Sequence, residues 1–305
     1  MNPYKKNCKI FSIKGFNLIE ILVSLAIGVF ISMVSVQMMV SNRQTYEETS
    51  RYSEVKENIR FAMLQLNQSS RSIGFYGPTT TGLPDIVTPI VSGLTCLGNA
   101  SFSDINISLW VVEATDVSIK NCLSHAEPDS DVVVVKYATF VNEYTLNDYF
   151  VAVSMAESKI FKYTGVGSIP FPTANILKYT PYIYYVKNNG SIPVMMRVGL
   201  DGKAVELSNG VEKLRVQLGK ITGNDIRYYD TDKLPDINDL KAMQITLVVR
   251  SEGKSTQPND KTFILCNTKY ATCSTDRKNT YHPVSLNGMN KYKRTTLMAT
   301  MQLKL

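Results

Sequence analysis

The chain has 305 residues, enough for one or two domains, and 44% of them are hydrophobic. It carries 33 basic and 26 acidic side chains, a net charge of +7, and four of the lysines lie within the first 15 residues. The remainder therefore carries only about +3 (7 minus 4). A dedicated nucleic-acid binder shows a clustered basic stripe, whereas the densest later cluster, Lys291, Lys293 and Arg294, is explained by a solvated turn. We expect no direct contact with nucleic acid.

Residues 16–40 form an apolar run in which Glu20 is the one charged side chain. At about 1.5 Å per residue this run is long enough to cross a hydrocarbon core of roughly 30 Å. A carboxylate costs roughly 2.5 to 3.5 kcal/mol at mid-membrane, so Glu20 calls for a functional explanation. The preceding head contains Lys5, Lys6, Lys9 and Lys14 and no acid, which predicts a cytoplasmic N-terminus and a translocated remainder.

The junction Lys14-Gly15-Phe16, with Glu20 four residues after Phe16, resembles the class III signal of type IV prepilins and type II pseudopilins. The resemblance implies that a prepilin peptidase cuts between Gly15 and Phe16 and methylates the new N-terminus at Phe16. Asn17 departs from the pattern, since a small hydroxyl residue is commoner there. The cut would create an α-amino cation that the Glu20 carboxylate can neutralise, within one chain or between adjacent subunits. Glu20 is therefore the expected assembly residue.

The helix is predicted to continue beyond the membrane to about residue 73. Tyr52, Val55, Ile59, Leu66 and Ile73 continue an apolar stripe at steps of three, four and seven, with charged side chains between them. Glycines at 74 and 77, the second followed by a proline, are typical of a helix end. We expect a leader at 1–15, a transmembrane or filament-core helix at 16–41, an amphipathic helix at 42–74 and a β-rich periplasmic or extracellular domain at 75–305.

Strand signals dominate after residue 77. Runs rich in Val, Ile, Tyr and Thr occur at 107–112, 132–137, 159–163, 182–187, 194–198, 211–218, 243–250, 262–266 and 296–303. Asn189-Gly190 and Asp201-Gly202 predict hairpin turns, and 78–98 reads as an irregular connection. The expected fold class is α+β and type IV pilin-like: a long N-terminal helix, transmembrane in its first half, packed on an enlarged antiparallel sheet.

Segments 41–46, 57–62 and 71–75 are similar to the N-terminal region of PilW-type minor pilins, and 211–217, 241–251 and 294–305 to their C-terminal region. The resemblance covers about 14–78 strongly and 210–305 more weakly. It implies a minor pilin in the initiation and assembly of a type IV pilus, at or near the tip, supporting adhesion, twitching motility or DNA uptake. The implied partners are the prepilin peptidase, other minor pilins, the major pilin and the inner-membrane assembly platform. The implied location is the inner membrane, then the pilus at the cell surface.

Four of the five cysteines fall on the far side of the membrane, where disulfides form. They allow three pairings, and the shortest loops favour Cys96 with Cys122 and Cys266 with Cys273. Each such bond is typically worth roughly 2 to 4 kcal/mol. A metal site with His125 or His282 is the rival interpretation, but the spacing does not suit zinc.

A run of aspartates forms a second candidate metal site: Asp225, Asp230, Asp232, Asp236 and Asp239. Calcium loops have a D-x-D-x-D-G pattern, which residues 233–235 interrupt, so a solvated acidic loop is the preferred interpretation. We expect no metal and no cofactor.

Neither a catalytic motif nor a phosphate-binding glycine loop is present, so we do not expect an enzyme. Two alternatives to the pilus role remain open. One is a minor pseudopilin of a type II secretion machine. The other is a tip adhesin, in which the aromatic-rich middle of the chain contacts a ligand; most of those aromatic side chains are better explained as sheet core.

Overall fold

The computed structural model describes residues 15, 17–79, 82–92, 94, 102–116, 119, 122–171, 173–223, 225–231, 240–255, 261–268, 271–282 and 292–303. The chain divides into two compact units, Met1–Thr49 and Ser50–Leu305. The helix α1 (Leu18–Ser72) contributes to both units. It ends at Ser72, and Gly74 follows with a φ of 74°, the left-handed conformation that commonly follows a helix and that glycine adopts without strain. The predicted end of the helix is confirmed.

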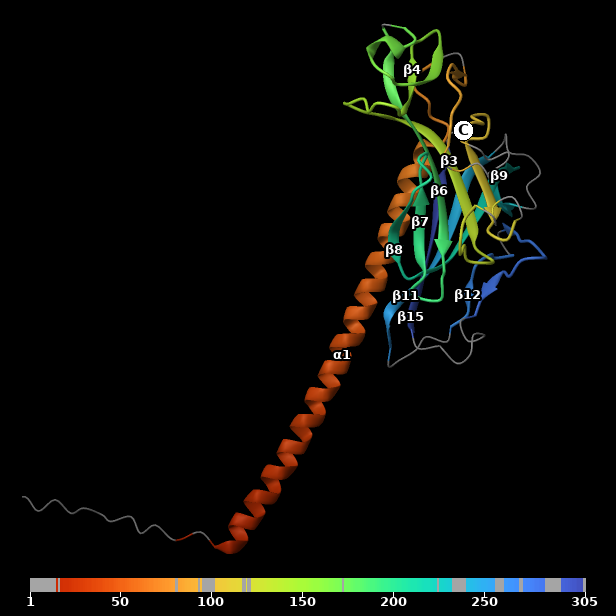
Figure 1. Ribbon diagram of the computed structural model, residues 1–305. Coiled ribbons are helices and arrows are strands. Elements are labelled where there is room, and N and C mark those ends of the chain that lie inside the picture. The colour runs from red at the N-terminus through yellow and green to blue at the C-terminus, as the bar shows by residue number, and fades with distance from the viewer. Residues whose placement is uncertain are drawn as a thin grey trace, which may run out of the picture. The chain divides into compact units, whose positions relative to one another are not determined.

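Three sheets make up the rest of the second unit (Figure 1). The strands of the larger sheet are β1 (Asp85–Ile86), β2 (Leu109–Glu113), β3 (Asp131–Phe140), β4 (Tyr149–Val153), β5 (Ser158–Lys162), β6 (Asn175–Lys187), β7 (Val194–Val198) and β8 (Ala204–Asn209). The short helix η2 (Val166–Ser168) follows β5. The other strands are β9 (Val211–Thr222), β10 (Asp225–Asp230), β11 (Leu240–Lys254), β12 (Phe263–Ile264), β13 (Ala271–Thr272), β14 (Thr280–Tyr281) and β15 (Tyr292–Gln302).

The larger sheet has eight strands in the order β1-β5-β4-β6-β3-β2, and β7 pairs with both β6 and β8. The second sheet has the order β13-β10-β9-β11-β15, and β12 pairs with β14 in a third sheet. All pairings are antiparallel except β1 with β5 and β10 with β13. The fold class is thus α+β with a long N-terminal helix and mainly antiparallel sheets, as predicted.

The main core of the second unit lies between the C-terminal half of α1 and the two large sheets. Val55, Ile59 and Leu66 of α1 are at most 3% exposed and share this core with apolar side chains of β3, β6, β9, β11 and β15. Hydroxyl groups reinforce the packing: Ser69 Oγ lies 2.6 Å from Tyr184 Oη of β6, and Ser208 Oγ of β8 donates to the Asn58 carbonyl at 2.9 Å. The predicted apolar stripe is therefore a packing face from Val55 to Ile73, whereas its first member, Tyr52, is 40% exposed.

Strand β3 of the larger sheet is buried on both faces, which explains its nearly continuous apolar sequence. Val133 and Val135 face the main core, whereas Val132 and Val134 pack with Phe102, Ile119 and Leu123 in a second cluster on the opposite face. Each of the nine predicted runs overlaps an observed strand, although β12 keeps only two residues of the run 262–266. Sequence analysis missed β1, β4, β8, β10, β13 and β14.

Candidate functional site

The N-terminal segment carries the first candidate site, and its geometry centres on Glu20. Asn17 precedes α1, and its backbone N–H donates to Glu20 Oε2 at 3.2 Å. In the same turn the Asn17 carbonyl accepts from the Glu20 N–H at 2.9 Å. An acidic side chain at the third helical position that reaches back to the capping residue completes one half of a capping box. The Glu20 carboxylate is thus directed toward the N-terminal side of the helix; Gly15 is exposed, and Phe16 lies outside the described residues.

The helical residues that follow expose an apolar surface all round. Side chains from Leu18 to Val40 are exposed, and α1 is long and apolar enough to cross a membrane by length and composition. The hydroxyls of Ser32 and Ser35 donate to the carbonyls four residues earlier, each at 2.8 Å, so neither polar group needs water.

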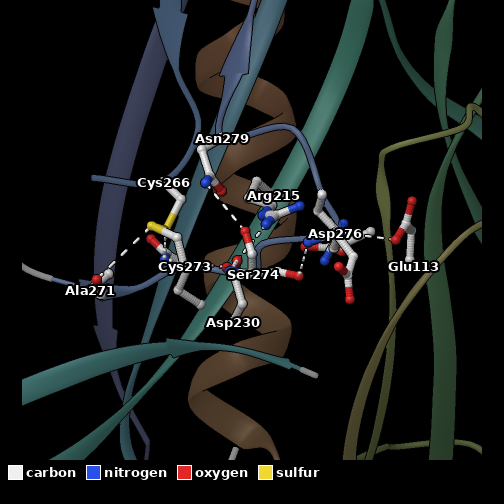
Figure 2. A network of polar contacts seen from close by, with 12 residues as sticks. Glu113, Arg215, Asp230, Cys266, Ala271, Cys273, Ser274, Asp276 and Asn279 are labelled. Atoms are coloured by element: carbon white, nitrogen blue, oxygen red, sulfur yellow. Dashed lines mark hydrogen bonds and ion pairs between the residues drawn. A yellow bond between two sulfur atoms is a disulfide. The ribbon is translucent and has the colours of Figure 1, made fainter. Parts of the chain in front are cut away.

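A second group of functional-looking side chains is a buried polar cluster beside β9 and β10 (Figure 2). Arg215 Nη2 lies 2.5 Å from Asp230 Oδ2, and the two side chains are at most 1% exposed. The same carboxylate oxygen accepts from the backbone N–H of Ser274 at 2.6 Å. The free-energy cost of removing these two charges from water is offset by their direct hydrogen bonds. The effect of the ion pair is to hold the 274–279 loop against the sheet.

The cluster also joins the two large sheets. Asp131 of β3 accepts from the backbone N–H of Val216 of β9 at 2.6 Å and from Arg277 Nη2 at 2.5 Å. Arg277 Nε in turn lies 3.0 Å from Glu113 Oε2 of β2. Burial raises the pKa of the Asp131 carboxyl, against the opposing charges of Arg277 and Arg215. These groups are buried and pair with one another, although Arg215 Nε and Nη1 and Arg277 Nη1 have no hydrogen-bond partner among the described residues. A buried set of opposite charges that links two sheets is the pattern of a structural network.

The cysteines end up in two places. Cys266 and Cys273 are joined by a disulfide (Figure 2), with a Cα–Cα distance of 5.9 Å. Gln217 Nε2 lies 2.7 Å from Cys266 Sγ. Cys122 also takes part in a disulfide, whereas Cys96 lies outside the described residues. The bond between Cys266 and Cys273 closes the loop that carries β13, the strand that pairs with β10.

The aspartates of the proposed calcium site do not meet in the part of the chain that the structure describes. Asp225 is exposed at the start of β10, whereas Asp230, at its end, is fully buried against Arg215. Asp232, Asp236 and Asp239 lie outside the described residues. Among the described residues no group of three or more His, Cys, Asp or Glu side chains is placed to hold a metal ion, and this includes His125 and His282.

Most aromatic side chains of the middle region belong to the core. Those at 9% exposure or less are Tyr137, Tyr149, Phe150, Phe161, Tyr179, Tyr184 and Tyr185, and Tyr163, Phe171 and Tyr182 are partly buried. Phe140 and Tyr144 are exposed, at 69% and 44%. The burial favours a scaffold role for most of these rings over a contact surface.

Sequence analysis missed the polar network altogether. The sequence pattern that could have revealed this network is the alternation of Lys213, Arg215 and Gln217 with apolar residues. These residues lie in a strand that is buried on both faces. Alternation of this kind normally indicates a solvated face, and only the position of β9 between two layers turns these side chains inward.

Comparisons with known proteins match the C-terminal part of the chain to one family model. Residues 183–304 match the family model PilW, described as Type IV Pilus-assembly protein W. A comparison with curated proteins gives no significant match. Among solved structures, the chain is similar to a type IV-like pilin from Thermus thermophilus, with 10% identity over 81% of this chain and 96% of that chain. The TM-score of this match is 0.32.

Proposed function

We propose that this chain, which belongs over residues 183–304 to the PilW family of type IV pilus assembly proteins, is a minor pilin that takes part in starting and building the pilus. Pilins of this family are structural proteins. The finer role that we propose is a position at or near the pilus tip, in support of adhesion, twitching motility or DNA uptake.

The observation that carries this proposal is the apolar surface of α1 from Leu18 to Val40, which is exposed on all sides. Such a surface must be covered in the cell, because water contact costs about 25 cal/mol for each Å² of apolar area. Lipid covers it while the subunit waits in the inner membrane, and the helices of neighbouring pilins cover it after assembly. We propose residues 16–41 as this membrane and filament-core segment and 1–15 as the removed leader.

The orientation of the Glu20 side chain supports the proposal. Its carboxylate already accepts from the backbone N–H of Asn17, one residue beyond Phe16. A cut between Gly15 and Phe16 places a new α-amino cation within that same turn. An amine and a carboxylate in apolar surroundings attract each other strongly, and the partner can be the same chain or the adjacent subunit. We propose that the prepilin peptidase cuts the chain first. The pairing then sets the register in which the subunit joins the other minor pilins and the major pilin at the assembly platform.

The test compares Glu20→Ala with Glu57→Ala, a matched control at an exposed position of the same helix. Mass spectrometry of the membrane fraction is expected to show that both variants begin at methylated Phe16. Surface pili sheared from the cells are expected to fall severely for Glu20→Ala and to stay at the wild-type level for Glu57→Ala. Wild-type piliation by Glu20→Ala would remove Glu20 from the mechanism, and a mature chain beginning at Met1 would overturn the leader.

A gene deletion separates the pilus role from a role in type II secretion. We expect the deletion to reduce surface pili and to leave the level of secreted enzymes unchanged. Loss of secreted enzymes with normal pili would instead assign the chain to a secretion pseudopilus.

A further inference from the structure

A cavity of about 790 Å³ lies in the second unit, beneath the β6–β7 hairpin. Its walls come from the hairpin residues 188–193, the loop 127–129, β14, and the strands β9, β11 and β15. Gly210 fixes this arrangement: its φ is 77°, its N–H donates to the Pro193 carbonyl, and an added Cβ would lie 2.1 Å from the Arg250 carbonyl. The size is within the range of pockets that bind small organic ligands, roughly 300 to 1,000 Å³.

Two arginines and one glutamate form one wall of the cavity. Arg250 of β11 and Arg294 of β15 stand directly opposite each other in the sheet, where like charges are unfavourable. Glu212 occupies a bulge of β9. Val248 of β11 pairs with Lys213 and Val249 pairs with Val211, so Glu212 is skipped in the pairing of the two strands. Its carboxylate accepts from Arg294 Nε at 2.8 Å and from Arg294 Nη2 at 3.0 Å. One carboxylate thus serves two guanidinium groups.

The contacts of Arg250 fix its side chain but leave part of its guanidinium group without a hydrogen-bond acceptor among the described residues. Its group lies 4.1 Å above the Tyr292 ring, and Nη2 donates to the Ser191 carbonyl at 2.8 Å. Its Nε is 3.6 Å from Glu212 Oε1, beyond hydrogen-bond distance. No described residue accepts a hydrogen bond from Nη1. A cation that is positioned by a ring and a carbonyl, with donors to spare, is suited to bind a carboxylate.

The opposite walls carry polar pairs and a second ring. Lys213 Nζ lies 2.7 Å from Glu127 Oε1 and 5.7 Å from the centre of the Tyr281 ring, and Lys278 Nζ lies 2.9 Å from Asp129 Oδ2. Burial, and next the negative charge of Glu212, raise the pKa of Tyr281, so its hydroxyl keeps its proton. Across the cavity, four cations face three carboxylates, a formal excess of +1 (4 minus 3).

We propose that this cavity binds an acidic saccharide, with the sugar carboxylate on Arg250 and the hydroxyls on the flanking carboxylates, amides and lysines. Sugar hydroxyls both donate and accept, and the cavity presents donors and acceptors side by side, with Tyr281 and Tyr292 among the residues that line it. A peptide would instead need apolar side-chain pockets, whereas the aliphatic lining here amounts to a leucine, an isoleucine and two prolines, beside the rings of Tyr281 and Tyr292. The inference adds a ligand to the proposed pilin role and does not depend on filament assembly.

The test is isothermal titration calorimetry on the full chain in detergent micelles. The probes are trigalacturonic acid and 3′-sialyllactose, each with its fully methyl-esterified form as a neutral counterpart of matched size. At least one acid is expected to bind ten times more tightly than its neutral counterpart. Equal affinity for acid and counterpart, or no heat from either acid, would overturn the proposal. So would tighter binding of an acidic tripeptide such as acetyl-Ala-Glu-Ala-amide.

The variants assign the binding to this cavity. Arg250→Gln is expected to weaken binding of the acid at least tenfold, whereas Arg227→Gln, an exposed arginine on β10, is expected to bind as the wild type does. Unchanged binding by a folded Arg250→Gln chain would refute the assignment. If circular dichroism shows that Arg250→Gln does not fold, Lys278→Gln replaces it, because the Lys278 side chain is 76% exposed. This variant is expected to bind the acid three times more weakly than the wild type, with a weaker dependence of the affinity on salt. Piliation is scored in cells, so failure of sugar binding leaves the assembly role standing.

Discussion

Lys136 provides a test of the buried structure whose size follows from its surroundings. It lies in the middle of β3 with no exposed surface, and its Nζ donates to the backbone carbonyl of Asp104. Burial lowers the pKa of Lys136 from 10.5 to about 8, although the charge of Asp104 opposes the shift. The unfolded chain therefore holds a proton on this amine over a pH range in which the folded chain has released it.

The sign follows from proton binding. Between pH 8 and 10.5 the unfolded state binds more protons, so the free energy of unfolding increases with pH, and this contribution disappears as the pH falls through 8. At 1.36 kcal/mol per pKa unit, the increase from pH 7 to pH 9.5 is about 2 kcal/mol. Burial raises the pKa of nearby Tyr76 to about 12, so tyrosine ionisation in the unfolded chain lowers stability above about pH 10. The range of the measurement therefore ends at pH 9.5.

The assay is urea unfolding of the full chain in micelles, followed by the fluorescence of Trp110, the one tryptophan of the sequence. Trp110 pairs with Val134 on the neighbouring strand, two residues from Lys136, and so reports on this part of the sheet. The difference in unfolding free energy between wild type and Lys136→Met is expected to change by about 2 kcal/mol from pH 7 to 9.5 in favour of the wild type. Parallel pH profiles for the two proteins would refute the reasoning.

Three further substitutions test the packing by the same unfolding measurement. Asp230→Ala leaves Arg215 buried without its carboxylate and is expected to cost about 3 to 5 kcal/mol, whereas the exposed Asp225→Ala is expected to cost less than about 0.5 kcal/mol. Cys273→Ser opens a loop of 7 residues and is expected to cost about 2 kcal/mol, and an equal stability of oxidised and reduced wild type would contradict this. Leu66→Ala empties a site that is 2% exposed and is expected to cost about 2 to 5 kcal/mol; a smaller loss would mean that the helix face does not form the core.

The helix and the longer strands were predictable because each of their signals is local. Spacing alone identified Val55, Ile59 and Leu66 as a packing face, and β-branched runs marked β3, β6, β9 and β11. By contrast, β4 has the sequence Tyr-Phe-Val-Ala-Val, a five-residue apolar run too short to distinguish a strand from other buried segments. The short strands β13 and β14 depend on partners far away in the sequence, and no local pattern marks them. Strand β12 lies within the predicted run 262–266 but keeps only two of its residues.

The cavity was not predictable for a related reason. Its charged residues come from three strands and two loops that lie together only after both sheets have formed. In the sequence, Lys293 and Arg294 belong to a basic cluster that a solvated turn explains, yet Arg294 is 5% exposed and pairs with Glu212, 82 residues earlier. A bulge such as the one at Glu212 changes the direction of a side chain without any change in residue type. Sequence patterns do not determine the register between strands. That register decides whether such charged side chains contact water or each other.

The cavity walls come partly from the region that matches the family model and partly from outside it. Arg250, Arg294 and Glu212 all lie within residues 183–304, the part of the chain that matches the PilW model. Glu127 and Asp129 come from the loop before β3, outside that match, and the Asp129 carboxylate holds the exposed Lys278 at the rim. The matched part therefore supplies the cation that would select for an acid, and the unmatched loop supplies acceptors that would choose among hydroxyl arrangements. If the cavity binds a sugar, relatives that differ in this loop should keep the preference for a carboxylate and differ in the sugar that carries it.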